Sequence, residues 1–414
     1  APARGPDGVA PIMNGSPATC PRGDAPSICF IHTSPAMVHL LTGTGPDAMG
    51  GAELQMYLLG RELAGRGWAV SFLVGDYGQG AALITDEGLR VEPGYETGRR
   101  GALFGTARAL NRFWQALASV DADVYVTRGL TGQTGVVAAF ARSRGRHSLF
   151  WFGKNADATY AVPRLSGLPF AERVPAWYGM RHADAIVCQS RQQLGLLREH
   201  VGREGVLIRN VAPWHGWECS RGTGGPVLWV GSIQPKKRPE MILQIAAQLP
   251  EVQFVMAGGK MRGHASLYER TLLQAADLPN VQFLGFVPHS EIGRHFLEAD
   301  MLISTSDGEL EGFPNVFLQA WCVGLPVVAS CDPDGIIARH GLGYVHQTTP
   351  GLVRAISAVR TDRQLHRGMA ARAREYVEEH HSPDRVGRDL DHLLRDLLEA
   401  GPPAVGTPGE RVHP

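Results

Sequence analysis

The chain has 414 residues, 44% of them hydrophobic, which is enough to bury more than one hydrophobic core and favours two domains. Its 40 basic and 40 acidic residues balance, which argues against a protein built to coat nucleic acid. Six cysteines without C-x-x-C pairs fit a reducing cytoplasm, and because no long apolar run occurs we expect neither a membrane-spanning helix nor a secretory signal.

Short β-rich runs alternate with helical patterns in the first half of the chain. This alternation predicts a βαβ series, in which helices connect parallel strands. Residues 1–27 are rich in Pro, Gly and Ala, and we expect them to be disordered. From the elements that follow we expect an N-terminal Rossmann-like domain over 28–212. Its elements are strands at 28–32, 69–74, 124–126, 148–152, 185–188 and 206–208, and a long helix at 52–64.

A stretch rich in helix and strand breakers at 211–226 predicts the boundary between two domains. The alternation then restarts, which predicts a second Rossmann-like domain over 222–380. A helix at 381–400 and a disordered tail at 401–414 complete the chain. The second domain's expected elements are strands at 227–230, 253–257, 281–284, 301–304 and 326–329, and a helix at 239–249.

The two halves differ slightly in charge. Through Asn210 there are 21 basic and 17 acidic residues, and after it 19 and 23. A mildly basic first half could face an anionic acceptor or a membrane surface, although basic runs such as 142–147 are more often simply solvated. Peripheral membrane contact is therefore left open, while we expect no nucleic-acid partner.

Residues 309–330 carry the most informative pattern, an acidic loop with glycine followed by a short helix and a strand. We expect Asn315 to be the N-cap of a helix over 316–321. The amides and the dipole at its start attract an anion such as a diphosphate, and Glu311 can accept hydrogen bonds from sugar hydroxyls. Gln319 then lies about one turn inside, within reach of a ribose. Alternatively, Glu311 only caps the helix dipole and Gln319 is solvated.

The segments Glu311-Gly-Phe, Gln319-Ala and Gly324-Leu-Pro-Val-Val together resemble the E-x7-E region of the retaining glycosyltransferases of family 4. The second glutamate of that pattern is Gln319 here, which keeps an acceptor oxygen but lacks the charge. The resemblance covers residues 28–398 and is most specific in 227–330. It implies the α/β GT-B fold, with two Rossmann-like domains facing a central cleft and a C-terminal helix crossing back to the first domain.

A glycine pair opens the first long helix, in the run Met49-Gly-Gly-Ala-Glu53. Bare backbone at Gly50 and Gly51 could approach a donor phosphate closely, although glycine pairs before helices are often only tight turns. In the resembled family the matching loop lines the interdomain cleft, which favours the functional interpretation.

The turn after the strand at 227–230 supplies the candidate for leaving-group stabilisation. A lysine between a strand and a helix can neutralise charge that builds on a leaving nucleotide, and we select Lys237. Gly231 fits the family pattern, but Ser232 stands where the family has an arginine. Lys236 or Arg238 could compensate, and a solvated lysine cluster is the alternative.

Loops after two further strands should line the crevice of an open α/β sheet, at Gly258 and at Phe286-Val287. In the resembled family, backbone near these last two residues contacts the base. The catalytic candidates are thus Glu311 and Lys237. The donor-binding candidates are Gly50, Gly51, Gly231, Ser232, Gly258, Phe286, Val287, Gly312, Phe313, Pro314, Asn315, Val316 and Gln319.

The first-domain strand that ends in Gly153-Lys-Asn155 occupies the place where many relatives present a histidine near the reacting sugar. This chain has none there. Lys154 and Asn155 are the candidates for acceptor contact, and turn residues without a chemical role are the alternative.

Several patterns suggest metal sites only weakly. Asp121-Ala-Asp123 and Asp332-Pro-Asp334 match the D-x-D pattern that holds a divalent metal in the other main glycosyltransferase fold, but the first reads as an ordinary turn. We expect His380-His381, beside a proline at a helix break, to lie on the surface. No metal and no resident cofactor are therefore expected.

The expected function is transfer of a sugar from a UDP-linked or other nucleotide diphosphate donor to a hydroxyl of a carbohydrate, lipid-linked or small-molecule acceptor. The resemblance implies retention through front-face transfer, with the leaving phosphate taking the acceptor proton. Two alternatives stay open. Ser232, Gln319 and the missing histidine suggest a catalytically weak GT-B protein that acts as a binding or assembly partner, and a nucleotide-sugar epimerase could share the architecture.

Overall fold

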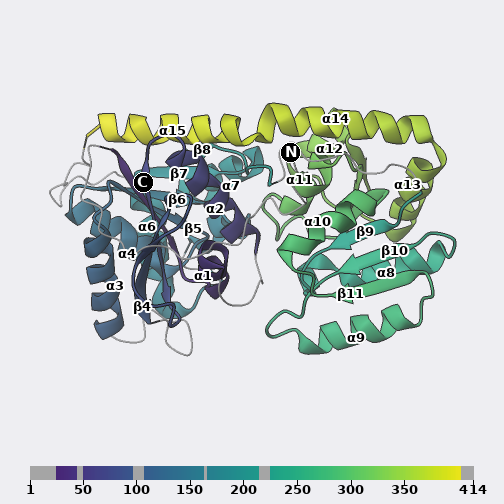
Figure 1. Cartoon of the computed structure of the whole chain (residues 1–414), viewed down its shortest axis with the longest axis horizontal. Coiled ribbons are helices and arrows are strands. Elements are labelled where there is room, and N and C mark those ends of the chain that lie inside the picture. Colours follow the sequence, from purple (N-terminus) through teal and green to yellow (C-terminus); the bar gives the residue numbers. More distant parts are fainter. Residues whose placement is uncertain (1–24, 44–49, 97–106, 163–165, 214–223, 402–414) are drawn as a thin grey trace. The chain divides into compact units, whose positions relative to one another are not determined.

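The computed structural model describes residues 25–43, 50–96, 107–162, 166–213 and 224–401 (Figure 1). These residues form two compact units. The first unit comprises the described residues up to Ile208 together with 387–401, and the second comprises Arg209–Val386. Each unit has its own largely parallel β-sheet, so the prediction of two Rossmann-like domains is confirmed.

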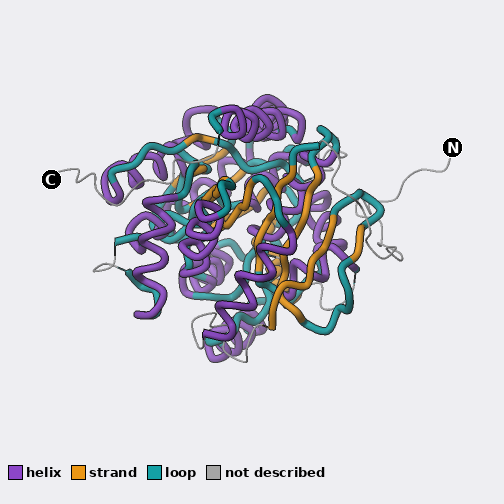
Figure 2. Tube along the Cα trace, turned by 90° about the vertical axis from the view of Figure 1, so that its left-hand side faces the viewer, coloured by secondary structure: helices purple, strands orange, loops and turns teal. Residues whose placement is uncertain are grey.

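The sheet of the first unit has eight strands in the order β3-β4-β2-β1-β5-β6-β7-β8. All pairs are parallel except β3 with β4. The strands form a middle layer with helices on both faces (Figure 2), which explains why β6 is buried along its whole length. The strands are β1 (Ser27–His32), β2 (Ala69–Asp76), β3 (Leu83–Ile84), β4 (Arg90–Glu96), β5 (Val124–Arg128), β6 (His147–Trp151), β7 (Ala185–Cys188) and β8 (Val206–Leu207).

The helices of the first unit include most of α15, the last helix that the structure describes, whose residues 383–386 belong to the second unit. Trp68 Nε1 donates a hydrogen bond to Asp391 Oδ1 at 2.6 Å, and the Arg395 guanidinium lies over the Trp68 ring at 5.8 Å, so α15 packs against this unit as expected. The helices are α1 (Pro35–Thr42), α2 (Gly51–Ala64), α3 (Ala107–Val120), α4 (Gly132–Ser143), α5 (Ala156–Tyr160), α6 (Phe170–His182), α7 (Arg191–Val201) and α15 (Pro383–Glu399). Among the described helices, none is both long and apolar enough to cross a membrane.

The sheet of the second unit has six parallel strands in the order β11-β10-β9-β12-β13-β14. One apolar core lies on each face, and β9, β10 and β12 contribute to both. The strands are β9 (Val227–Val230), β10 (Phe254–Ala257), β11 (Val281–Gly285), β12 (Met301–Ser304), β13 (Val327–Ala329) and β14 (Gly343–Val345). The helices are η2 (Pro235–Lys237), α8 (Pro239–Gln248), α9 (Ala265–Ala276), α10 (His289–Glu298), α11 (Asn315–Cys322), η3 (Pro333–Gly335), α12 (Ile336–His340), α13 (Thr349–Thr361) and α14 (Arg363–His381).

Disorder was predicted for residues 1–27 at the start of the chain and for residues 401–414 at its end. β1 begins at Ser27, so the expectation of disorder was wrong for that residue, because it pairs with Ala69 of β2. Residues 1–24 and 402–414, and 214–223 of the expected interdomain stretch, lie outside the described residues.

Each sheet reverses its winding direction at one place. In the first sheet the chain builds β2 and β4 on one side of β1 and then β5 on the other. In the second it builds β10 and β11 on one side of β9 and then β12 on the other. Open α/β sheets bind ligands beyond the carboxyl ends of the strands at such switch points. The loops after β1 and β5, and after β9 and β12, are therefore where a functional site is expected.

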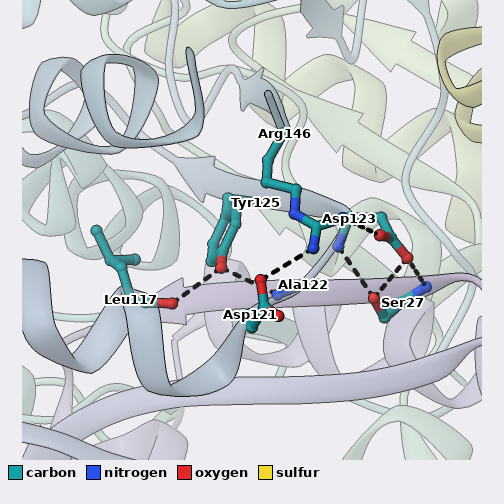
Figure 3. A network of polar contacts seen from close by, with 7 residues as sticks. All are labelled: Ser27, Leu117, Asp121, Ala122, Asp123, Tyr125 and Arg146. Atoms are coloured by element: carbon teal, nitrogen blue, oxygen red, sulfur yellow. Dashed lines mark hydrogen bonds and ion pairs between the residues drawn. The ribbon is translucent and has the colours of Figure 1, made fainter. Parts of the chain in front are cut away.

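The first D-x-D pair is held by structural contacts (Figure 3). Asp123 accepts hydrogen bonds from the Ser27 amide at 2.9 Å and the Ser27 hydroxyl at 2.7 Å. Arg146 donates to Asp123 at 2.7 Å and to Asp121 at 3.0 Å. These bonds tie the residues before β5 and β6 to the start of β1, which agrees with the turn interpretation.

The second D-x-D pair lies at the start of α12. Asp332 accepts hydrogen bonds from the amides of Ile337 at 2.8 Å and Ala338 at 3.1 Å, so its carboxylate caps that helix. Within the described ranges, no three His, Cys, Asp or Glu side chains are grouped so that they could hold a metal ion. Metal independence itself stays a prediction.

Candidate functional site

Three charged side chains meet at the switch point of the second sheet. Lys237 Nζ lies 2.9 Å from Glu311 Oε1, and Lys236 Nζ lies 3.3 Å from the same oxygen. The side chains of Lys237 and Glu311 are 14% and 11% exposed, whereas that of Lys236 is 30% exposed. The two catalytic candidates of the sequence are therefore in direct contact, largely shielded from water.

Backbone hydrogen bonds position both lysines. The Thr305 hydroxyl donates to the carbonyl of Lys237 at 2.6 Å, and the Asp307 amide donates to the carbonyl of Lys236 at 2.7 Å. Arg238 follows with a left-handed φ of 46° and pairs with Asp307 at 2.9 Å. Three consecutive residues of the loop after β9, Lys236, Lys237 and Arg238, thus contact the loop after β12. The partner of Arg238 in that loop is Asp307.

Two glycines allow the loops after β9 and β10 to approach closely. A Cβ at Gly258 would lie 2.4 Å from the carbonyl oxygen of Gly231, so any side chain there would push the loops apart. A Cβ at Gly231 would lie 3.6 Å from Cδ of Lys237, which places the lysine stem beside this glycine. Ser232 accepts a hydrogen bond from Gln234 Nε2 at 2.6 Å. These candidates therefore share one edge of the sheet.

Phe286 presents an aromatic ring after β11. It is 52% exposed, and a Cβ at Gly259 would lie 3.1 Å from its ring, so the ring rests on that glycine. Gly285 before it has a φ of 68°, and Val287 after it is half-buried. The ring is a flat apolar surface against which a planar base could stack.

The start of α11 differs by one residue from the prediction. Pro314 occupies the N-cap position and Asn315 is the first helical residue, so the assignment of Asn315 as the N-cap was wrong. The Asn315 side chain instead accepts a hydrogen bond from Asn210 Nδ2 at 3.0 Å. The N-cap residue Pro314 makes no side-chain capping hydrogen bond, and Glu311 Oε1 pairs with the two lysines. The amide end of α11 therefore adjoins the loop that holds Glu311.

The remaining candidates of this segment differ in burial. Gly312 and Pro314 are buried and Val316 is half-buried. Gln319 is 7% exposed, which excludes the alternative of a solvated side chain. Phe313 is 6% exposed and its ring belongs to the core, so its backbone is what a ligand could contact.

His381 is buried, and the prediction of a surface position was wrong. It is 1% exposed, because its ring packs on Phe313 at 5.3 Å and on Tyr376 at 5.5 Å. Its Nδ1 lies 2.7 Å from the carbonyl oxygen of Asn210. Burial lowers the pKa of His381 to about 3, so the imidazole is neutral and Nδ1–H donates this bond.

The switch point of the first sheet holds polar and charged side chains that were not predicted from the sequence, and burial lowers the pKa of one of them, His32. His32 ends β1, and its Nε2 lies 3.8 Å from Glu53 Oε1 in the first turn of α2. Arg128 ends β5, and its guanidinium lies over the Trp151 ring at 5.4 Å. Burial lowers the pKa of Arg128 to about 10, against the opposing effect of Glu53 and Asp157, so it stays charged at neutral pH.

Gly50 and Asp157 lie next to the cluster formed by His32, Glu53 and Arg128. Gly50 is the N-cap of α2, and a Cβ there would lie 2.4 Å from Glu53 Oε2, so glycine leaves room for the carboxylate over the helix start. Gly51 is the first helical residue. Asp157 is fully buried and accepts hydrogen bonds from the amides of Gly153 at 2.7 Å and Lys154 at 3.1 Å, and burial raises its pKa.

The two acceptor candidates have local partners. The Lys154 ammonium lies over the Tyr160 ring at 4.6 Å. Asn155 is 4% exposed, donates to Gln192 at 3.2 Å and accepts from Gln193 at 3.3 Å, so its side chain joins α5 to α7. The residues at the switch point could have been found from the positions at which the predicted strands end.

Comparison with known proteins gives two family matches in succession. Residues 50–214 match the glycosyl transferase 4-like domain, and residues 221–376 match the glycosyl transferases group 1. Sucrose-phosphate synthase from Thermosynechococcus elongatus is similar in structure, with a TM-score of 0.72, 18% identity, and coverage of 91% of this chain and 100% of that chain. Anabaena Alr3699/HepE in complex with UDP and glucose gives a TM-score of 0.68 at 18% identity, with coverage of 89% and 99%.

Sequence relatives match over a shorter stretch. The D-inositol 3-phosphate glycosyltransferase of Mycobacterium leprae (strain Br4923) is 33% identical over 110 residues, which are 26% of this chain and 25% of the relative. That of Mycobacterium tuberculosis (strain F11) is 34% identical over 107 residues, 25% of this chain and 22% of the relative. The chain thus spans about a quarter of the length of the curated relatives it matches. With its two sheets and two successive domain matches, the chain belongs to the glycosyltransferases of the GT-B fold.

Proposed function

We propose that the chain is a retaining glycosyltransferase that uses a nucleotide diphosphate sugar, UDP-linked, as its donor. The observation that carries the proposal is the contact of 2.9 Å between Lys237 and Glu311 at the switch point of the second sheet. There, cationic groups for a diphosphate and a carboxylate for sugar hydroxyls lie side by side, next to the amide end of α11.

The second unit supplies the groups that a donor needs. Lys237 and Lys236 offer positive charge to the phosphates, and Glu311 accepts hydrogen bonds from the sugar. Gln319 offers an amide to the ribose, and the ring of Phe286 offers a surface to the base. The similar Anabaena structures are complexes with UDP, with UDP and glucose, and with UDP-glucose, which supports UDP as the nucleotide.

The transfer step that fits these groups needs no nucleophile from the protein. The acceptor oxygen bonds to the anomeric carbon on the face from which the diphosphate departs, the bond between that carbon and the phosphate oxygen breaks, and the acceptor proton passes to the departing phosphate. Lys237 stabilises the charge that develops on the diphosphate. We propose that neither a metal ion nor a resident cofactor takes part.

The first unit supplies the acceptor contacts in this proposal. Paired His32 and Glu53 can exchange hydrogen bonds with hydroxyl groups, and Arg128 is held in place by Trp151 and the charge of Asp157. Such a set suits a polyol, whether it is a free carbohydrate, a small molecule or the head of a lipid-linked acceptor. Lys154 lies just before α5, the helix that contains Asp157, and remains a proposed contact.

Thermal-shift measurements with UDP, GDP, ADP and their sugars test the donor, because a ligand that binds only the folded state raises the melting temperature. We expect UDP and one UDP-sugar to stabilise the protein. With that donor and a panel of acceptors, NMR of the product should show the anomeric configuration of the donor, and chelator should leave the rate unchanged.

Other outcomes would select the alternatives. Binding without transfer or hydrolysis of any donor would favour the assembly partner, and a changed sugar formed from donor alone would favour the epimerase. An inverted product would contradict retention, and loss of activity with chelator would contradict metal independence.

A further inference from the structure

One side of α6 carries a line of exposed apolar side chains. Phe170 is 88% exposed, Val174 is 66% exposed and Trp177 is 39% exposed. Spacings of four and three residues place them on one side of the helix, and Arg181, four residues further, continues the same line. We call Phe170, Val174, Trp177 and Arg181 the outer face of α6.

The opposite side of α6 is fixed against α4, which lies beside it in Figure 1. A Cβ at Gly179 would lie 2.6 Å from the amide nitrogen of Gly135, so the two helices touch through their backbones. Ala176 and Met180, which flank this contact, are fully buried. The helix is therefore already packed on its inner side, and the apolar line on the outer face is not needed for that packing.

Positive charges gather at the C-terminal end of the outer face. The Arg181 guanidinium lies over the Trp177 ring at 5.7 Å. Arg203 donates to the carbonyl oxygens of Met180, Arg181 and Ala183 at 2.7–3.1 Å, which is where the negative end of the helix dipole lies. Burial, together with the charges of Arg142, Arg181 and Arg203, lowers the pKa of His182. These contacts hold the arginines through carbonyl oxygens and a ring.

Helix α9 also carries exposed leucines, but its surroundings differ from those of α6. Leu273 is 68% exposed and Leu272 is 43% exposed. The charges near them are paired, Lys260 with Glu269 at 3.4 Å and Arg270 with Glu240 at 4.0 Å. The outer face of α6 differs because its apolar line ends at Arg181, whose guanidinium lies over the Trp177 ring and donates to the carbonyl oxygen of Val201.

We propose that the outer face of α6 docks on the surface of an anionic lipid bilayer. Aromatic and aliphatic side chains of a surface helix settle at the boundary between headgroups and acyl chains, and neighbouring arginines attract lipid phosphates. The proposal is independent of the transfer reaction. If that reaction is also as proposed, docking brings the first unit to the surface where lipid-linked acceptors lie.

Co-sedimentation of the full chain with lipid vesicles tests this inference. We expect binding to vesicles that contain phosphatidylglycerol and much weaker binding to phosphatidylcholine alone. The double variant Phe170→Ser/Val174→Ser should lower partitioning by about tenfold or more, because two side chains no longer enter the interface. Arg181→Gln should lower it several-fold on the anionic vesicles only.

Leu273→Ser is the matched control, since it removes an equally exposed apolar side chain from α9 and should leave partitioning unchanged. Melting temperatures of all variants report that they fold. The inference is overturned if the wild type does not sediment with anionic vesicles, or if the α6 variants bind like the control. It is also overturned if light scattering shows a dimer that Phe170→Ser/Val174→Ser dissociates, because the face would then join two copies.

Discussion

The switch points of the two sheets are built from different kinds of residue. In the second unit, Gly231 and Gly258 let loops approach closely, and a single carboxylate, Glu311, contacts two lysines. In the first unit, the corresponding place holds buried or half-buried polar and charged side chains that β1, β5, α2 and α5 contribute singly. Backbone and lysines suit the diphosphate that nucleotide diphosphate sugars share, whereas individual side chains suit an acceptor that varies.

This contrast predicts a division of effects under the proposed function. Substitutions at the second switch point should alter donor turnover whatever acceptor is used. Substitutions at the first should alter acceptor use and leave donor binding unchanged. Variants of each unit test whether effects on donor turnover and effects on acceptor use are separated in this way.

The largest effect is expected for Glu311→Ala. Its carboxylate contacts both lysines and is proposed to hold the sugar, so transfer should fall by about 10²–10³ in kcat/KM. The melting temperature should change far less than the activity, because Glu311 is not part of an apolar core and both lysines that lose their partner keep some exposure to water. Steady-state kinetics and a thermal melt measure both. Asp307→Asn is the control. It removes a carboxylate of the same loop, but that carboxylate pairs with Arg238 and not with the two lysines. Equal activity in the two variants would remove Glu311 from its proposed role.

The next effect separates the two neighbouring lysines. Lys237→Met should lower kcat by about 10²-fold, because it removes the ammonium that lies closer to Glu311 and stabilises the leaving diphosphate. Lys236→Met should cost about tenfold or less, since its side chain is more exposed and more strongly screened. Single-turnover kinetics with one donor compare them. A larger loss for Lys236 would show that the shorter distance to Glu311 does not identify the lysine that contacts the phosphate.

The contrast between the two switch points also explains which elements and site residues could be predicted from the sequence. Alternating apolar runs predicted the strands and helices of both units, because buried parallel strands read as continuous apolar stretches. Turns that contain glycine pointed to Lys237 and Glu311 as candidate site residues. Loops whose backbones must approach closely need glycine, and glycine can be recognised in the sequence. Their mutual contact could not be predicted, because it depends on β12 lying beside β9.

Contacts between isolated residues escaped prediction. His381 bonds to the carbonyl of Asn210, 171 residues away, and no spacing rule relates the two. His32, Glu53 and Arg128 likewise come from three separate elements, and each alone looks like an ordinary surface charge. Only the strand order of the first sheet brings them together.

A smaller effect is expected for Arg128→Met in the first unit. Loss of the guanidinium should raise the acceptor KM by about tenfold, which corresponds to one charge-assisted hydrogen bond. The donor KM and the stabilisation by UDP should not change. Arg198→Met is the control, because Arg198 is an exposed arginine paired with Glu204 in the same unit. A fall in donor binding with Arg128→Met would break the division between the units.

The smallest effect concerns the residue at which this chain departs from the E-x7-E pattern. Gln319→Glu restores the carboxylate in a position that is 7% exposed. A charge-assisted hydrogen bond to a ribose hydroxyl is roughly twice as strong as a neutral one, so affinity for the donor should rise by about threefold to tenfold. Calorimetric titration with UDP at constant ionic strength measures the change, and Gln234→Glu, in the loop after β9, serves as the control for added charge.

The opposite result for Gln319→Glu would carry equal information. Burial disfavours an ionised carboxylate, so a site that excludes water from this part of α11 would lose affinity and would favour the neutral amide. A melting temperature that falls in the free variant but recovers with UDP would place the new carboxylate against the ribose. If the melting temperature of the variant stays low in the presence of UDP, the side chain at position 319 faces the core of the second unit. The donor site would then end at the first turn of α11.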